Sequence, residues 1–173
     1  MEAMFLRKAT VCDLPQAWRI ICDAKCFMAA KGSVQWTNDS PSQADIEADV
    51  RSGEAYVLCG SDGLAAAYAV VKAAPEPAYA APTAHWITGG PYVTVHRMAV
   101  GEAFRGKGYG RKTLVLCEDV CRHLDAYSVR IDTNYDNVEM LGLIRSLGYT
   151  PCGTVSYGPR GERLAFEKVV CCR

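Results

Sequence analysis

No charge of either sign dominates this 173-residue sequence, because 19 basic side chains are balanced by 19 acidic ones. A neutral chain lacks the diffuse positive field that drives nonspecific binding to nucleic acids or anionic membranes. We therefore expect neither a nucleic acid nor a membrane among its partners. Any polyanion would have to be recognised by a local cluster of cations.

The sequence also lacks an apolar run that could cross a bilayer. Its longest stretch without Lys, Arg, Asp or Glu runs from Pro77 to His96 and is broken by prolines and glycines. The first eight residues carry an acid at Glu2 and have no apolar core of signal-peptide length. We therefore expect a cytoplasmic protein.

Histidine is scarce, and the three that occur, His85, His96 and His123, are scattered along the chain. The nine cysteines are an odd number, and no two of them have the Cys-x-x-Cys spacing of zinc sites. In a reducing compartment such cysteines act as small core residues. The sequence therefore predicts no metal site.

Half of the residues are apolar and 22% are charged, which is typical of a globular protein. At this length we expect one domain covering residues 1–173. Turn signals and apolar periodicity predict alternating strands and helices of an α/β (α+β) fold. The predicted strands are Phe5–Thr10, Ala55–Cys59, Leu64–Lys72, Tyr92–Val100, Ser128–Thr133 and Leu164–Val170. The predicted helices are Asp13–Gly32, Ser42–Gly53, Gly110–Leu124 and Asn137–Leu147.

Two features of this pattern depend on local chemistry. Ser42 and Asp45 have the spacing of a capping box, which predicts the start of the second helix. The proline- and alanine-rich segment up to Pro91 is too long for a tight turn, so we expect a surface loop that folds over another part of the protein.

Glycines and cations are densest between the fourth predicted strand and its helix, in Arg105-Gly106-Lys107-Gly108-Tyr109-Gly110-Arg111. The glycines let the backbone approach a ligand closely, and the helix start offers free N–H groups with a positive dipole. These features favour a phosphate site. The alternative is a solvated turn that needs glycines only for its conformation.

Two other phosphate-binding motifs fit this segment less well. The residues from Gly101 to Lys107 match the first seven positions of a nucleoside-triphosphate P-loop, but Gly108 stands where that loop needs Ser or Thr for magnesium. A dinucleotide-binding loop requires a different glycine spacing, and it follows a parallel βαβ pattern rather than antiparallel strands.

Arg105-x-x-Gly108-x-Gly110, following a strand that ends Met98-Ala99-Val100, resembles the pyrophosphate loop of the GCN5-related N-acetyltransferase (GNAT) superfamily. Asn137, followed by Gly148-Tyr149, resembles a second motif of the same family. The strand and helix order fits the family over nearly the whole chain. The resemblance implies a single-domain GNAT fold with a mixed, mostly antiparallel, twisted sheet of six to seven strands and about four helices. Arg130-Ile131-Asp132-Thr133 and Gly148-Tyr149-x-x-Cys152-Gly153 resemble an uncharacterised bacterial subgroup.

This resemblance implies an acetyl-CoA-dependent N-acetyltransferase. The acetyl group would pass directly, in a ternary complex, to a primary amine of a small molecule or peptide. The implied partners are acetyl-CoA as co-substrate and the amine acceptor, and the protein would be a monomer or a homodimer. The residues implied in binding acetyl-CoA are Met98, Ala99, Val100, Arg105, Gly106, Lys107, Gly108, Tyr109, Gly110, Arg111 and Asn137.

His96 is the candidate general base, because some family members carry a Glu or His base at this place on the fourth strand and imidazole titrates in the right range. The alternative is a partly buried strand histidine bonded to a neighbour. Ile144 stands where the family usually has a tyrosine acid. A thiolate with a pKa near 8.5 can leave with little help, so activity remains compatible with Ile144. The alternative function is a catalytically weak or inactive CoA-binding sensor or interaction module.

The acceptor would be recognised by loops before the second helix and before the fourth strand. Trp36 and Trp86 are candidates for an apolar wall there, with core packing as the alternative role. Asp132 is a candidate to attract a cationic amine, with capping of a strand end as the alternative.

Overall fold

Residues 4–171 of the computed structural model are described, and they belong to two compact units. Unit 1 comprises the residues up to Val71 together with Arg97–Cys117. Unit 2 comprises Lys72–His96 and the residues from Glu118 onward. Residues 1–3, which begin the eight-residue segment that lacks signal-peptide character, lie outside the described residues. A single domain over the whole length stays a prediction.

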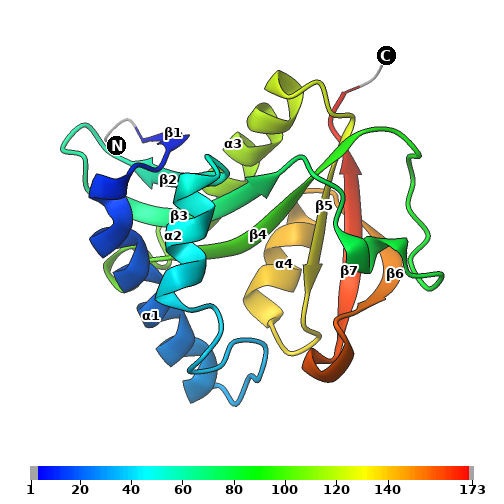
Figure 1. The fold of residues 1–173 in the computed structure, drawn as a ribbon, viewed down its shortest axis with the longest axis horizontal. Helices are drawn as coiled ribbons and strands as arrows, with labels where there is room; N and C mark the ends of the chain where they lie inside the picture. The colour runs from blue at the N-terminus through cyan, green and yellow to red at the C-terminus, as the bar shows by residue number, and fades with distance from the viewer. Residues whose placement is uncertain (1–3, 172–173) are drawn as a thin grey trace. The chain divides into compact units, whose positions relative to one another are not determined.

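Unit 1 contains helices and a set of strands, and the first three of these strands pair antiparallel (Figure 1). The strands are β1 (Phe5–Lys8), β2 (Ala55–Cys59), β3 (Ala65–Lys72, except its last residue) and the end of β4 (Tyr92–Val100). The helices are the 3-10 helix η1 (Val11–Asp13), α1 (Leu14–Ala30), α2 (Gln43–Arg51), the 3-10 helix η3 (Glu102–Phe104) and the start of α3 (Tyr109–His123).

The core of unit 1 forms where the apolar faces of α1 and α2 meet these strands. Ile20 and Ile21 of α1 and Ile46 of α2 pack with Val57 and Tyr68 of the sheet, and all five are buried. Burying a side chain of this size contributes about 1.5–3 kcal/mol. This packing holds the end of α1 in place, and α1 in turn contacts the glycine-rich segment described below.

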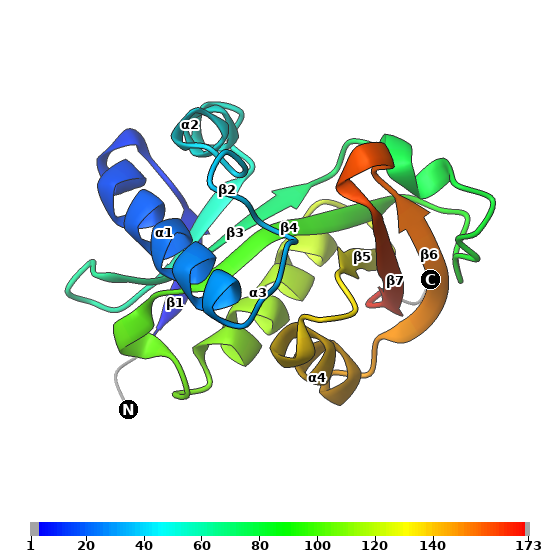
Figure 2. The same ribbon diagram turned by 90° about the horizontal axis from the view of Figure 1, so that it is seen from below.

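Unit 2 contains the rest of β4 and α3 and most of the remaining elements. These are the 3-10 helix η2 (Pro77–Ala80), β5 (Ser128–Thr133), α4 (Val138–Ser146), β6 (Thr150–Ser156), the 3-10 helix η4 (Gly158–Arg160) and β7 (Glu162–Val169). Figure 2 shows the strongly twisted hairpin formed by β6 and β7.

The seven strands have the order β1-β2-β3-β4-β5-β7-β6. β1 with β2, β2 with β3, β5 with β7 and β6 with β7 pair antiparallel, and β4 with β5 pairs parallel. In the parallel pair, Tyr92 stands opposite Ser128 and Thr94 opposite Arg130. The predicted mixed, mostly antiparallel sheet with helices is therefore confirmed.

Most predicted elements are found within one or two residues of their expected bounds. The capping box at Ser42 is confirmed, because Asp45 N–H donates to the Ser42 hydroxyl while the Asp45 carboxylate accepts from Ser42 N–H. Asp13 stands at the predicted N-cap of α1, but its carboxylate binds Arg7 and Thr10 rather than capping that helix.

The strand β6 was absent from the predicted elements. Pro151 and Gly153 interrupt its pattern, and the register with β7 shifts between these two residues. Gly153 has a φ of +97°, and a Cβ there would lie 2.1 Å from the Thr83 carbonyl oxygen. The glycine therefore permits the 73–91 segment to pair closely alongside β6, with Ala84 opposite Gly153.

Candidate functional site

The glycine-rich segment connects β4 to α3 within unit 1. Gly106 and Gly108 have φ values of +73° and +80°, which other residues adopt only with strain. The Lys112 N–H donates to the Gly108 carbonyl, so the first turn of α3 begins directly after Gly108. The N–H groups of a first helical turn have no partners within the helix and carry the positive end of its dipole. This arrangement suits phosphate oxygens.

Arg105 anchors this segment to α1 instead of extending into solvent. Its guanidinium donates to the Asp23 carbonyl at 2.7 Å and lies 4.5 Å from the centre of the Phe27 ring. The Glu102 N–H also donates to the Asp23 carboxylate, at 3.3 Å. Lys107 donates to the Ala103 carbonyl at 2.8 Å and is exposed. The backbone of the segment is therefore held at its first residue, before the glycines.

The end of β4 leads into this segment and departs from regular strand geometry. Arg97 has a φ of +48°, in the left-handed region that interrupts the pleat of a strand. Its guanidinium lies 3.5 Å from the buried Asp49 carboxylate, which also accepts from the Tyr68 hydroxyl. Of the predicted pantetheine-binding residues that follow, Ala99 is buried, while Met98 and Val100 are partly exposed.

His96, the predicted base, belongs to unit 2 and pairs with an acid there. Its Nε2 lies 3.2 Å from a carboxylate oxygen of Glu76, although the ring N–H is not aligned for a hydrogen bond. The side chains are 18% and 20% exposed, so solvent can still reach both. The interaction with His96 holds the pKa of Glu76 below its usual value despite partial burial. Glu76 is therefore ionised beside the imidazole at neutral pH.

A second acid of unit 2, Asp132, accepts hydrogen bonds from two tyrosines. The hydroxyls of Tyr79 and Tyr157 donate to the same oxygen, Oδ1, at 2.7 and 2.9 Å. Burial, followed by the charge of Asp132, raises the pKa of both phenols. Both tyrosines are therefore protonated donors at neutral pH.

Aromatic rings enclose the guanidinium of Arg130 in the same unit. Arg130 lies 3.9 Å from the centre of the Tyr92 ring and 4.3 Å from that of the Trp86 ring. Tyr79 is next to both rings, with centroids 4.7 Å from Trp86 and 6.2 Å from Tyr92. Trp86 also donates its indole N–H to the Tyr79 carbonyl. The 73–91 segment is thus held against the sheet of unit 2, as its length predicted.

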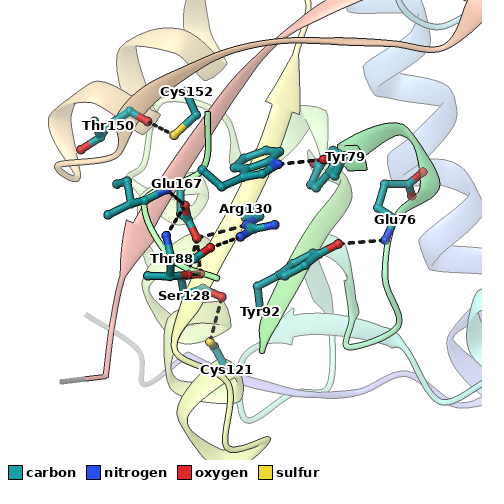
Figure 3. Close-up of polar contacts among 12 residues, drawn as sticks. Glu76, Tyr79, Thr88, Tyr92, Cys121, Ser128, Arg130, Thr150, Cys152 and Glu167 are labelled. Atoms are coloured by element: carbon teal, nitrogen blue, oxygen red, sulfur yellow. Dashed lines mark hydrogen bonds and ion pairs between the residues drawn. The ribbon is translucent and has the colours of Figure 1, made fainter. Parts of the chain in front are cut away.

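Arg130 pairs with the fully buried Glu167, its register partner across β5 and β7 (Figure 3). Glu167 also accepts from the Ser128 and Thr88 hydroxyls and from the N–H groups of Ile87 and Thr88. Burial would raise the pKa of Glu167, but the hydrogen bonds from the Ser128, Thr88 and Arg130 side chains and the charge of Arg130 outweigh it and leave the pKa below its usual value. The charge of the acid is therefore balanced inside the unit, and the acid fixes the end of the 73–91 segment.

The remaining predicted residues belong to several elements of the two units. Asn137 caps α4, because its side-chain oxygen accepts from the Met140 N–H. Ile144 is fully buried in α4, so no polar group replaces the usual tyrosine acid at this position. Trp36 packs against the core of unit 1, whereas Trp86 belongs to the aromatic group of unit 2.

Sequence reasoning missed Glu76, Tyr79, Arg130 and Glu167. Glu76 and Tyr79 lie in the 73–91 segment, where no periodic pattern marks a side chain that turns inward. For Arg130 and Glu167 the sequence did contain a signal, because each is a charged residue within an otherwise apolar strand. Buried charges are normally paired, so two such residues could have been predicted to pair with each other.

Within residues 4–171, no three His, Cys, Asp or Glu side chains are grouped so that they could hold a metal ion. In the same part of the chain, no helix is long and apolar enough to cross a membrane.

Comparison with known proteins identifies the family. Residues 22–149 match the family model described as Acetyltransferase (GNAT) family, and this match spans parts of both units. No curated protein matches the sequence.

Solved structures have the same fold. A GNAT-family acetyltransferase from Streptococcus agalactiae is 33% identical, with 96% of this chain and 95% of that chain covered and a TM-score of 0.85. A GNAT-family acetyltransferase from Listeria monocytogenes is 18% identical, with 96% and 94% covered and a TM-score of 0.71. The yncA protein from Salmonella typhimurium, solved with its cofactor acetyl-CoA, is 17% identical, with 99% and 96% covered and a TM-score of 0.66. This chain therefore belongs to the GNAT family of acetyltransferases.

Proposed function

We propose that this acetyltransferase moves the acetyl group of acetyl-CoA to a primary amine of a small molecule or peptide. The observation that carries the proposal is the segment after β4, where Gly106 and Gly108 adopt positive φ immediately before the start of α3. Backbone N–H groups at such a turn bind phosphate oxygens, and each charge-assisted bond contributes about 1.5–3 kcal/mol. Several of them would hold the diphosphate of acetyl-CoA against the loss of its hydration.

The interruption of β4 at Arg97 supports a role for the strand end in binding the acetyl-pantetheine arm. The arm contains amides, and an extended amide chain can pair with a strand edge. A backbone N–H near Met98 would then polarise the thioester carbonyl as negative charge develops on its oxygen. Asn137 would bind the pantetheine arm near its thiol end.

The His96–Glu76 pair supports a role in proton removal. An alkylamine with a pKa near 10.4 must lose a proton before attack, at a cost of about 4.6 kcal/mol at pH 7. In our proposal His96 takes this proton while Glu76 orients the ring and stabilises the resulting imidazolium. The amine nitrogen forms a bond to the acetyl carbon, the carbon–sulfur bond breaks, and CoA leaves as the thiolate.

A second candidate function is supported by Ile144, which is buried at the position of the usual acid. In this alternative the protein binds CoA but has weak or no catalytic activity, and serves as a sensor or interaction module. Catalysis does not require an acid at Ile144, because a thiolate is a good leaving group near neutral pH.

Calorimetry with acetyl-CoA, combined with thiol release across a panel of primary amines, tests both functions. Binding together with turnover on any amine supports the transferase and removes the sensor. Binding without turnover supports the sensor. No heat from either CoA or acetyl-CoA, with folded protein, would contradict both.

A further inference from the structure

One face of β4 and β5 in unit 2 carries a set of polar side chains. Alternate residues of a strand point to the same side, so Tyr92, Thr94 and His96 share one side of β4, and Arg130 and Asp132 share one side of β5. The register partner of Thr94 is Arg130, and Arg130 contacts the Tyr92 ring, which places both sets on one side of the sheet. We call these five residues the polar face.

On and around the polar face, Asp132 is the carboxylate for which the described residues supply no basic side chain as a partner. Glu76 lies beside His96, which matches its charge whenever the imidazole is protonated, and Glu167 is paired with Arg130. Asp132 receives only the two tyrosine hydroxyls, both on Oδ1. Among the described residues, no Lys, Arg or His forms an ion pair with it and no group donates to Oδ2. Because its side chain is only partly exposed, water screens this charge less than at the surface.

A second observation on the same face is independent of charge. The hydroxyl oxygen of Thr94 is fully buried and has no hydrogen-bond partner among residues 4–171. A buried polar atom without a partner costs about 1–3 kcal/mol. Thr94 stands between Tyr92 and His96 along β4, so a polar ligand on this face could satisfy it.

A single amine does not meet the two charge requirements of this face. The nitrogen that attacks the thioester must be neutral, and the proposed base beside it is His96. The nitrogen that complements Asp132 must stay charged, because a neutral amine leaves the carboxylate unmatched. The two requirements are met by two nitrogens in one molecule.

The aromatic side chains around the face indicate what links these nitrogens. Tyr79 and Tyr157 flank Asp132 through their hydroxyls, and Tyr92 and Trp86 lie next to Tyr79. Rings of this kind pack well against methylene groups, while Tyr92 and Trp86 already contact the Arg130 guanidinium. An alkyl chain ending in an ammonium group fits these surroundings better than an acidic or strongly polar acceptor.

We propose that the acceptor is an alkyl diamine whose non-reacting ammonium binds Asp132, held in place by Tyr79 and Tyr157. This inference rests on the proposed acetyl transfer to amines, and it names the class of acceptor. Asp132 acts as a specificity-determining residue. The reaction itself is unchanged: one nitrogen is acetylated, and the other keeps its protons.

The test compares acceptors that differ in the second charge. Initial rates with acetyl-CoA are measured for 1,4-diaminobutane, n-butylamine and 4-aminobutanoate. We expect kcat/KM for the diamine to exceed that for butylamine at least tenfold, mainly through KM, with 4-aminobutanoate the poorest. Equal kcat/KM for the diamine and butylamine would overturn the proposal while leaving acetyl transfer to amines intact.

Variants then assign the preference to Asp132. In Asp132→Asn, which keeps the shape and the bonds from the tyrosines, we expect the diamine preference to fall to within threefold of butylamine. Tyr157→Phe should lose part of the preference. Glu162→Gln, which removes an exposed charge at the start of β7, is the matched control and should retain it. A full preference in Asp132→Asn would overturn the assignment.

The inference can also be separated from the failure of catalysis. If no amine is acetylated, calorimetric titration of the CoA-bound protein with 1,4-diaminobutane replaces the rates. Binding that Asp132→Asn abolishes and Glu162→Gln retains would support the diamine site even though the proposed transfer had failed. No binding to the unmodified protein would overturn the inference. Thermal unfolding of each variant verifies that it is folded.

Discussion

Glu76 holds His96 with its carboxylate while its own backbone N–H donates to the hydroxyl of Tyr92, a residue on the same side of β4 as His96. The acid is therefore fixed at both its main chain and its side chain by one strand. This arrangement places an ionised acid beside the imidazole and suggests different roles for the two residues, His96 as the base and Glu76 as the group that positions it.

The pH–rate profile distinguishes these roles. An imidazole base gives an acidic limb near pH 6–7, whereas a carboxylate whose pKa is below its usual value gives a limb below about pH 4.5. We expect His96→Gln to lower kcat at least a hundredfold and to remove the limb, with acetyl-CoA affinity unchanged. Glu76→Gln should lower kcat by less than His96→Gln does and should keep the acidic limb near pH 6–7. A limb below pH 4.5 that disappears only in Glu76→Gln would make Glu76 the base.

Gly108→Ala should weaken acetyl-CoA binding without unfolding the protein. A Cβ at Gly108 meets no atom within 4 Å, so the effect comes from the φ of +80°, which costs about 1–2 kcal/mol for a residue with a Cβ. If the free loop relaxes and must return to this conformation on binding, the affinity falls about tenfold. Calorimetry measures the change, and unaltered affinity would argue against a phosphate site here.

Two glycines of unit 2 should respond to alanine in opposite directions. Gly153→Ala places a Cβ 2.1 Å from the Thr83 carbonyl oxygen at a φ of +97°, so we expect the free energy of unfolding to fall by at least about 2 kcal/mol. Gly142 lies in α4 with open space around it, and Gly142→Ala should raise the free energy of unfolding by about 0.5–1 kcal/mol. Urea denaturation measures both. Gly142→Ala also serves as the control for Gly108→Ala.

Glu167→Ala should be strongly destabilising. It leaves the buried guanidinium of Arg130 without its acid, and breaking a buried pair costs about 3–5 kcal/mol. It also removes the acceptor for Ile87 and Thr88, which hold the 73–91 segment. Chemical denaturation gives the loss, and the double variant Arg130→Met with Glu167→Leu should recover part of it. A loss below 1 kcal/mol would show that the pair contributes little.

Asp13 should make stability depend on pH in acid. Its hydrogen bonds from Arg7, and further bonds from Thr10, lower its pKa from 3.8 to about 2 in the folded protein. A depressed folded pKa contributes stability above the unfolded pKa, and this contribution is lost as the pH falls from about 4 to about 2. It amounts to about 2 kcal/mol at neutral pH. Asp13→Asn should remove it, so the stabilities of the two proteins should converge near pH 2. A constant difference over this range would contradict the assignment.

Elements bounded by local chemistry were predictable. The capping box at Ser42, the glycine after α2 and the apolar run from Tyr92 to Val100 depend on neighbours within a few residues, and each was found as predicted. The glycine-rich segment belongs to the same class, because its signal is a short spacing of glycines and cations before a helix. β6 was missed because Pro151 and Gly153 disrupt the alternation that marks a strand.

The order of residues along the chain was enough to indicate the family, the strand and helix pattern and the position of the glycine-rich segment. The sequence did not reveal which polar side chains contact each other, because these contacts join segments that lie far apart along the chain. They are Glu76 with His96, Arg130 with Glu167, and Asp132 with Tyr79 and Tyr157. Which carboxylate receives a cation and which does not depends on packing and burial across the sheet. The sequence names Asp132 as a candidate to attract a cationic amine, but its lack of a basic partner, and with it the proposed diamine, could be found only once the strands were folded against one another.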